Sequence, residues 1–240
     1  METLEQRVAQ ARENIRAAAL EAGRDPAEVT LVAATKTQTD ETIRAAIRAG
    51  ITVCGENRVQ EMNAHLAENA YEGAKLHFIG RLQTNKVKYV VGKVSLIHSV
   101  DSLHLAEAIE RQADKLGVVQ DILLEVNVGG EEAKGGFSPA ETQTAAETIS
   151  QFPHLRLRGL MAIPPICVAA GGNREFFVKM AQLYVDIRTK INDNVSVINC
   201  LSMGMSRDYE DAVRAGATMV RLGTTLFGPR AQKAVPSHKN

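Results

Sequence analysis

The chain has 240 residues, a length typical of a single α/β barrel and ample for a sizeable hydrophobic core. Its 28 basic residues equal its 28 acidic residues, so no broad positive field favours nucleic acid or anionic lipid as a partner. No apolar stretch approaches the ~20 residues of a membrane helix, and the N-terminus is unlike a signal peptide, so we expect one cytoplasmic domain over residues 1–240.

The first element that the sequence predicts is an amphipathic helix. Apolar side chains recur at steps of three and four residues between positions 3 and 20. They are Leu4, Val8, Ala11, Ile15 and Ala18. This stripe indicates an extra N-terminal helix, within residues 1–24, that docks on a larger body.

Eight short apolar runs follow, and helical segments separate most of them. The runs span residues 30–35, 52–56, 76–80, 94–100, 121–128, 155–163, 195–204 and 219–228. Several lack strict alternation, as parallel strands buried on both faces do. Ser138-Pro139-Ala140-Glu141 predicts a helix start with a capping box, and Gly117 predicts a helix end. Eight such units fit a (β/α)8 TIM barrel over residues 30–230 better than an open doubly wound sheet.

Polar residues end several of these runs, and the active face of such a barrel lies at the carboxyl ends of its strands. Lys36 closes the first run. Its amine is strongly hydrated and seldom buried without a partner, so its place at the end of an apolar strand needs an explanation. Taken alone, a lysine of this kind is more often solvated or ion-paired. Residues 164–173, with paired Pro and paired Gly, predict a mobile loop after the sixth strand.

The last two runs predict a phosphate site, because barrels often bind phosphate with the loops after strands seven and eight. Gly223 would let the backbone approach closely, and Ser202 and Thr224 could add hydroxyl donors. From the residue types alone, tight turns are an equally good explanation. The position of these segments in the fold favours phosphate.

Closure of the barrel places strand eight beside strand one, so Lys36 and the phosphate site would share one mouth. Pyridoxal 5′-phosphate (PLP) carries a phosphate and an aldehyde on one ring, and it forms a Schiff base with lysine. Arg221 lies between the two anchors and could donate to the pyridine nitrogen. An arginine that only donates leaves the ring a weak electron sink. This favours limited proton transfer, or no catalysis, over transamination.

Other chemistries have less support in the sequence. The histidines show no partner spacing for a metal, and the glycines form neither a dinucleotide fingerprint nor a P-loop. Three widely spaced cysteines give no disulfide framework. His77, inside an apolar run, is more often a satisfied core residue than an acid or base.

Several longer motifs together resemble the pyridoxal phosphate homeostasis protein family, from about residue 28 to residue 230. With Lys36 they are GENRVQE (55–61), LHFIGRLQTNK (76–86), RGLMAIPP (158–165), LSMGMSRDYEDAVRAGATMVRLGT (201–224) and LFGPR (226–230). The resemblance implies a barrel like the N-terminal domain of alanine racemase, with PLP held as a Schiff base on Lys36.

The same resemblance implies the remaining cofactor contacts. These are Asn57, His77, Met161, Ser202, Met203, Arg221, Gly223 and Thr224. Ser202, Gly223, Thr224 and the Met203 amide would hold the phosphate. Arg221 would face the ring nitrogen, and the others would line the pocket. Lys134 matches a lysine of the family and is a candidate to receive or pass on cofactor.

The resemblance favours a PLP carrier over an enzyme. It implies a role in vitamin B6 homeostasis, supplying or buffering PLP for apo-PLP enzymes, as a monomer or weak dimer. Alanine racemase takes its second acid/base, a tyrosine, from a further β-domain, for which this chain leaves no residues after the barrel. The alternatives are a weak PLP-dependent amino-acid racemase, with Lys36 as one base, and a phosphosugar-type barrel that binds no PLP.

Overall fold

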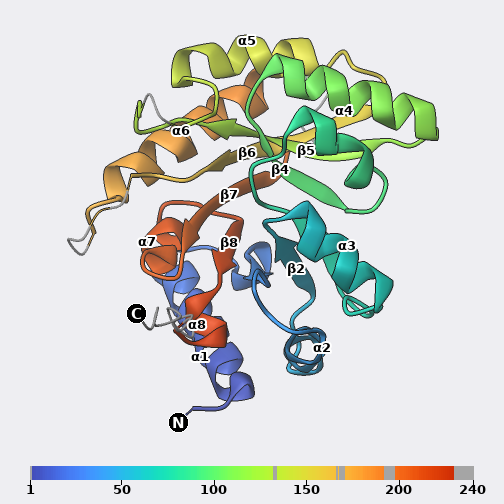
Figure 1. Ribbon diagram of the computed structural model, residues 1–240. Coiled ribbons are helices and arrows are strands. Elements are labelled where there is room, and N and C mark those ends of the chain that lie inside the picture. The colour runs from blue at the N-terminus through green and yellow to red at the C-terminus, as the bar shows by residue number, and fades with distance from the viewer. Residues whose placement is uncertain (1, 132–133, 166, 168–170, 192–197, 230–240) are drawn as a thin grey trace, which may run out of the picture.

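Eight parallel strands close into a barrel (Figure 1). The computed structural model describes residues 2–131, 134–165, 167, 171–191 and 198–229. Its strands pair in chain order, and β8 pairs back with β1. The strands are β1 (Thr30–Ala34), β2 (Val53–Glu56), β3 (Lys75–Phe78), β4 (Leu96–Val100), β5 (Gln120–Val126), β6 (Leu155–Ala162), β7 (Cys200–Met205) and β8 (Met219–Leu222). The predicted (β/α)8 barrel is therefore confirmed.

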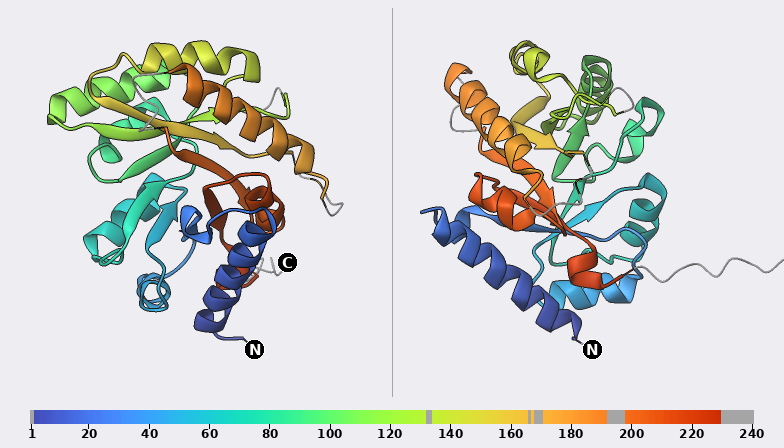
Figure 2. Two further views of the ribbon diagram at one scale, coloured as in Figure 1. Left: turned by 180° about the vertical axis from the view of Figure 1, so that it is seen from behind. Right: turned by 90° about the vertical axis from the view of Figure 1, so that its left-hand side faces the viewer.

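Helices surround the strands, as Figures 1 and 2 show. They are α1 (Leu4–Glu21), α2 (Asp40–Arg48), α3 (Val59–Ala67), α4 (Leu103–Leu116), α5 (Pro139–Ile149), α6 (Arg174–Lys190), α7 (Tyr209–Arg214) and α8 (Thr224–Phe227), with 3₁₀ turns η1 (Pro26–Glu28) and η2 (Thr84–Tyr89). The predicted helix ends are confirmed: Ser138 and Glu141 form a capping box, and Gly117 ends α4 with a φ of 64°. None of the helices among these described residues is long and apolar enough to cross a membrane.

The strands differ from the predicted runs by a few residues at their ends, and the last two differ most. The run at 219–228 stops being a strand at Leu222, because the chain turns at Gly223 into the short helix α8. The run at 195–204 forms a strand only from Cys200, and residues 192–197 lie outside the described residues. Part of the predicted loop at 164–173, residues 166 and 168–170, also lies outside them.

The N-terminal helix α1 completes the outer layer beside the last two helices (Figure 2). Its predicted stripe is buried at Val8, Ala11 and Ile15. Arg7 Nε donates to the carbonyl of Leu226 at 2.5 Å, which ties α1 to α8. The short helix α8, with four residues, thus packs beside the much longer α1 in the outer layer.

The barrel interior differs from the layer between strands and helices. The large apolar core lies in that outer layer, whereas the interior holds two small apolar clusters. One of these contains Leu96 and Cys200, with Met219 packed against it. Side chains two residues apart on a strand share a face, so His98, Ser202 and Arg221 follow these three residues toward the carboxyl ends. The interior therefore becomes polar just below the barrel mouth.

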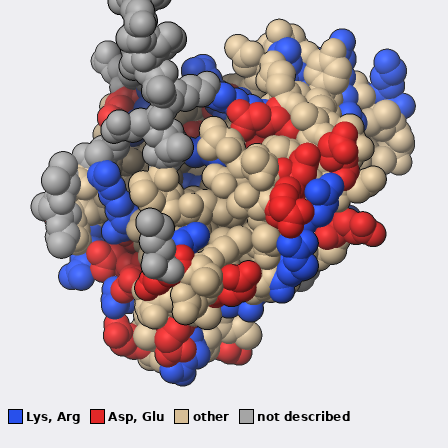
Figure 3. Space-filling model, turned by 60° about the horizontal axis from the view of Figure 1, so that its bottom comes forward, with Lys and Arg blue, Asp and Glu red and all other residues tan. Residues whose placement is uncertain are grey.

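Charges of both signs mingle on the surface. Figure 3 shows one face on which acidic and basic side chains alternate over short distances. Such a surface presents no broad field of one sign. The pattern on this face agrees with the equal numbers of acidic and basic residues in the chain.

Candidate functional site

A cavity of about 800 Å³ opens at the carboxyl ends of the strands. We call it the main cavity. Its polar and charged lining consists of Lys36, Asn57, Lys134, Asn173, Ser206, Arg207, Asp208, Asp211, Arg221 and Thr224. Lys36 thus meets Arg221 and Thr224, which lie far from it in the sequence, in one space. The register of β1 with β8, which pairs Val32 with Arg221, brings them together.

Lys36 stands two residues beyond β1, where a buried polar cluster fixes the strand end. Thr35 is fully buried, and its Oγ1 lies 2.5 Å from Glu56 Oε1. Tyr71 donates to the same carboxylate oxygen at 3.0 Å. Burial raises the pKa of Glu56, against the hydrogen bonds from Thr35 and Tyr71, which lower it. This cluster ties the ends of β1 and β2 together directly beneath Lys36.

Arg221 forms the back of the main cavity and is only 5% exposed. Its Nη1 donates to Ser202 Oγ at 2.6 Å, and its Nη2 donates to the carbonyl of Ala162 at 2.9 Å. Burial lowers the pKa of Arg221 to about 10, while the nearby charges of Glu125 and Asp208 raise it. A guanidinium has five N–H groups, so two are used here and three remain for a ligand.

Ser206 lies at the mouth of the main cavity, where Ser202 was expected. Ser206 lines the main cavity, and its Oγ accepts hydrogen bonds from the amides of Gly223 and Thr225, at 3.2 Å each. Its hydroxyl proton is not used in these two bonds. The loop after β7 is thus fastened to the first turn of α8.

Ser202 lies deeper than expected, because β7 continues to Met205. The Ser202 side chain is fully buried, with its oxygen bonded to Arg221 and His98. Met203 is also fully buried and packs in the outer core. Among the described residues that line the main cavity, neither appears. Ser202 therefore supports Arg221 from below the main cavity.

His77 and Met161, the other expected lining residues, also lie below the main cavity. His77 is 4% exposed and bonds through Nδ1 to His98 Nε2 at 3.0 Å. Met161 is fully buried in the apolar floor with Leu96 and Leu123. Neither belongs to the described lining of the main cavity. They form the layers on which the cavity rests.

Two buried amide oxygens in the cavity wall lack hydrogen-bond partners among the described residues. They are Oδ1 of Asn57 and Oδ1 of Asn173. Asn173, which the sequence analysis missed, donates through its nitrogen to Asp208 at 2.7 Å. Buried polar atoms are seldom left unpaired. These two oxygens suit a ligand that carries hydroxyl or other donor groups.

The charged groups at the rim leave the main cavity positive. Four cations line it: Lys36, Lys134, Arg207 and Arg221. Its two carboxylates have other partners, since Asp208 accepts from Asn173 and from the Met205 amide, and Asp211 pairs with Arg174 at 3.0 Å. Lys134 pairs with Glu131. An anionic ligand is therefore favoured over a cationic one.

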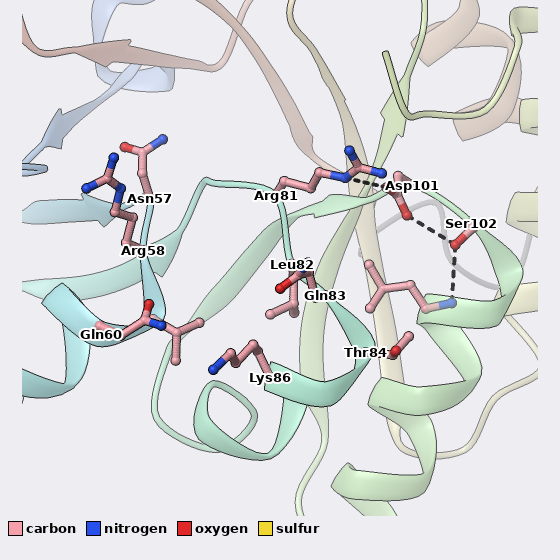
Figure 4. A pocket seen from close by; sticks show the side chains of 12 residues that line it. Asn57, Arg58, Gln60, Arg81, Leu82, Gln83, Thr84, Lys86, Asp101 and Ser102 are labelled. Atoms are coloured by element: carbon pink, nitrogen blue, oxygen red, sulfur yellow. Dashed lines mark hydrogen bonds and ion pairs between the residues drawn. The ribbon is translucent and has the colours of Figure 1, made fainter. Parts of the chain in front are cut away.

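A second hollow of about 580 Å³ lies at the same mouth, over β2, β3 and β4 (Figure 4). We call it the side hollow. Arg58, Arg81 and Lys86 line it, and Asn57 lies in its wall as well as in that of the main cavity. Arg81 Nε lies 3.9 Å from Asp101, which accepts a hydrogen bond from Ser102. The side hollow is basic, and among the described lining residues it shares Asn57 with the main cavity.

Comparisons with known proteins give the family of the chain. The family model for the alanine racemase N-terminal domain matches residues 7–231. The pyridoxal phosphate homeostasis protein of Aquifex aeolicus (strain VF5) is 44% identical over 225 residues, which cover 94% of this chain and 97% of that protein. This chain belongs to the pyridoxal phosphate homeostasis protein family. The resemblance expected from the motifs is therefore confirmed.

Solved structures agree with this membership in the pyridoxal phosphate homeostasis protein family. PipY of Synechococcus elongatus PCC7942, solved with PLP bound, superposes with a TM-score of 0.78 at 32% identity, covering 94% of this chain and 100% of PipY. A protein from Bifidobacterium adolescentis gives a TM-score of 0.85 at 37% identity, covering 93% of this chain and 94% of that one. Both relatives match nearly the whole chain, so the barrel and its N-terminal helix belong to the shared fold.

Proposed function

We propose that this chain binds PLP in the main cavity and takes part in PLP homeostasis, as its relatives' names state for them. Lys36 would hold the cofactor as a Schiff base, and the protein would supply or buffer it without robust catalysis. The observation that carries the proposal is the meeting of Lys36, Arg221 and the Ser206 loop in one cavity. The PLP-bound structure of PipY supports the same assignment.

The lining of the main cavity fits the groups that PLP brings. PLP supplies an aldehyde, a pyridine nitrogen, a ring hydroxyl and a phosphate. The Lys36 amine would add to the aldehyde carbon, and one water would leave. Arg221 would donate to the ring nitrogen, and Asn57 Oδ1 would accept from the ring hydroxyl. Ser206 and the first turn of α8 would hold the phosphate, together with Thr224.

The character of Arg221 supports storage or delivery over amino-acid turnover. Its neutral partners, Ser202 Oγ and the Ala162 carbonyl, leave the guanidinium charge in place. A charged donor facing the ring nitrogen disfavours a proton there and so weakens the ring as an electron sink. Release of PLP to an apo-PLP enzyme needs no such sink.

The absorption spectrum of the purified protein with added PLP tests the binding site. We expect a Schiff-base band that borohydride fixes onto Lys36, and its loss in Lys36→Ala. Lys134→Ala is the matched control, because it removes the other lysine that lines the main cavity. A band that survives Lys36→Ala, or a label on Lys134 in the wild type, contradicts the proposed attachment.

Amino-acid exchange and PLP transfer test the carrier role. Holoprotein is incubated with single enantiomers in deuterated water, and Cα exchange above the Lys36→Ala background would support the weak racemase instead. In a second assay, holoprotein reactivates an apo-PLP enzyme in the presence of a scavenger of free PLP. Reactivation no faster than free PLP allows would contradict direct delivery and leave storage.

A further inference from the structure

A chain of buried hydrogen bonds crosses the barrel interior below the main cavity. It begins where Arg221 Nη1 meets Ser202 Oγ at 2.6 Å. Ser202 Oγ lies 2.9 Å from His98 Nδ1, and His98 Nε2 lies 3.0 Å from His77 Nδ1. These residues stand on β8, β7, β4 and β3, and each is at most 5% exposed. The chain therefore links four strands through the polar layer of the interior.

The direction of these hydrogen bonds follows from the protons available. Arginine has no acceptor atom, so Arg221 donates and Ser202 Oγ accepts. The single hydroxyl proton of Ser202 then goes to His98 Nδ1, its other neighbour. A neutral imidazole that accepts at Nδ1 carries its proton on Nε2. His98 accordingly donates to His77 Nδ1, and the proton of His77 lies on its Nε2.

The opposite direction would leave a buried donor unpaired. If His98 donated to Ser202, the serine proton would have no acceptor among the described residues, and this side chain is fully buried. An unpaired buried donor costs about 1–3 kcal/mol. When the bonds run from Arg221 through Ser202 and His98 to His77, the N–H without an acceptor among the described residues is Nε2 of His77. This residue is 4% exposed.

The electrostatic surroundings favour neutral imidazoles in this chain. Burial lowers the pKa of His77 to about 4. Burial, His77 and Arg221 together hold the pKa of His98 well below its usual range. The charged groups that act on the two histidines of this hydrogen-bond chain are the cations of Arg221, on β8, and Lys75, on β3. Both histidines thus act as hydrogen-bonding groups and not as extra positive charges under the cavity.

We propose that Ser202, His98 and His77 are positioning residues that hold Arg221 in one orientation, as the donor to the ring nitrogen of PLP. The Ser202 oxygen and the Ala162 carbonyl fix both terminal nitrogens of the guanidinium. Its remaining N–H groups can then face the cavity without a search among rotamers. This inference rests on the proposed function for the identity of the ligand, whereas the direction of the chain rests on the protein alone.

Side-chain ¹⁵N NMR of the PLP-free protein tests the direction of the chain. We expect both histidines to be neutral at pH 7, with an unprotonated Nδ1 and a protonated Nε2. In Ser202→Ala, His98 loses the donor that fixes its tautomer, and its two nitrogens should report a mixture. A protonated Nδ1 in the wild type at either histidine, as the other tautomer or as an imidazolium, would overturn the inference.

PLP affinity and the visible band of the bound cofactor test the consequence for Arg221. Ser202→Ala should weaken affinity by about fivefold, as expected for one hydrogen bond, and shift the band while the label stays on Lys36. His98→Leu should do the same, and His98→Gln, which can accept and donate, should restore the wild-type values. The control Thr142→Val removes another buried hydroxyl, which bonds to Ser138 on the outside of the barrel.

The outcomes separate this inference from the proposed function. If the wild type binds PLP but Ser202→Ala matches Thr142→Val in affinity and band, the positioning role is wrong and the function stands. If the wild type binds no PLP, the proposed function fails and the ring-nitrogen role falls with it. Denaturant unfolding of each variant checks that any loss of affinity does not come from unfolding.

Discussion

The main cavity and the side hollow lie at the same barrel mouth and share Asn57, yet their cations are held differently. Arg221 in the main cavity is 5% exposed and fixed by two neutral acceptors. The side chains of Arg58 and Arg81 in the side hollow are 71% and 77% exposed. The number of cations alone therefore does not distinguish a ligand-binding site. A buried donor whose direction is fixed by its neighbours does distinguish one.

The partners of these cations sharpen the contrast. Arg58 pairs with Glu61 at 3.1 Å, and Arg81 approaches Asp101 at 3.9 Å, and in both pairs the arginine side chain is exposed. Exposed ion pairs of this kind contribute little, because water and salt screen them. Arg221 instead has neutral partners in a buried layer, where its charge is screened far less. Matched substitutions in the two spaces should therefore give unequal effects.

Replacement of the buried arginine should have the largest effect. Arg221→Met removes charge-assisted donors from the main cavity, and we expect PLP affinity to fall by about 10- to 100-fold. Arg81→Met in the side hollow should change it by less than about twofold. Equilibrium dialysis measures both. Equal losses in the two variants would break the distinction between the spaces.

The wall that the two spaces share should be sensitive to added volume. A Cβ at Gly80 would lie 2.1 Å from the backbone oxygen of Asn57. Gly80→Ala should therefore lower the free energy of unfolding by about 1–3 kcal/mol and disturb both spaces. In Gly117→Ala the Cβ meets nothing within 4 Å, although φ is +64°, so that variant reports backbone strain alone. Denaturant unfolding would contradict the clash if the two variants lost the same stability.

Loss of one hydroxyl group in each of the two spaces should give a smaller difference in PLP affinity. Ser206→Ala removes the residue that fastens the loop after β7 to the amides of Gly223 and Thr225, so PLP affinity should fall by about fivefold. Ser102 in the side hollow caps α4 instead. Ser102→Ala should cost about 1 kcal/mol of stability and leave affinity unchanged. A loss of affinity in Ser102→Ala would give the side hollow a part in binding.

The pH dependence of stability should show the smallest net effect in the wild type, because the buried histidines His77 and His98 oppose the buried carboxyl groups of Glu56 and Glu125. The pKa of His77 is lowered to about 4, so the unfolded state binds more protons between about pH 4 and 6.5 and stability rises with pH there. Burial and Asp101 raise the pKa of Glu125 to about 7, so the folded state binds more protons between about pH 4.5 and 7 and stability falls with pH.

Substitution of Glu125 should reveal the opposing contribution of the histidines to the pH dependence of stability. Glu125→Gln removes the falling contribution, and unfolding between pH 4.5 and 6.5 should then show stability that increases with pH. The wild type should be flatter over the same range. A Glu125→Gln profile as flat as that of the wild type would mean that neither His77 nor His98 titrates with a lowered pKa.

The sequence predicted the barrel and the meeting of Lys36 with Arg221, because eight apolar runs and barrel closure depend on patterns that span the chain. The sequence did not reveal that Ser206, and not Ser202, lines the main cavity, and the reason is local. The pattern of β7 does not reveal where the strand ends, and Gly204 turns the backbone with a φ of +89° before Ser206 reaches the mouth. Asn173 escaped notice because only the folded loop brings it back to the cavity.

The polar layer of the interior was also hidden from the sequence. His77 and His98 lie on separate strands, and each alone looks like a satisfied core residue. Their partnership depends on the register of β3 with β4, and the contact with Ser202 crosses the interior to β7. Chains of polar residues across a barrel have no fixed spacing along the sequence. They become visible once all strands are in place.

The position of α1 bears on the order in which the molecule can be assembled. Residues 4–21 leave the ribosome well before residues 209–227, which form the helices α7 and α8 on which they pack. The helix α1 must therefore wait for α7 and α8 to be synthesised before it can pack on them. A nascent chain stalled before β8 would carry an exposed apolar stripe at Val8, Ala11 and Ile15, a surface that a chaperone can recognise.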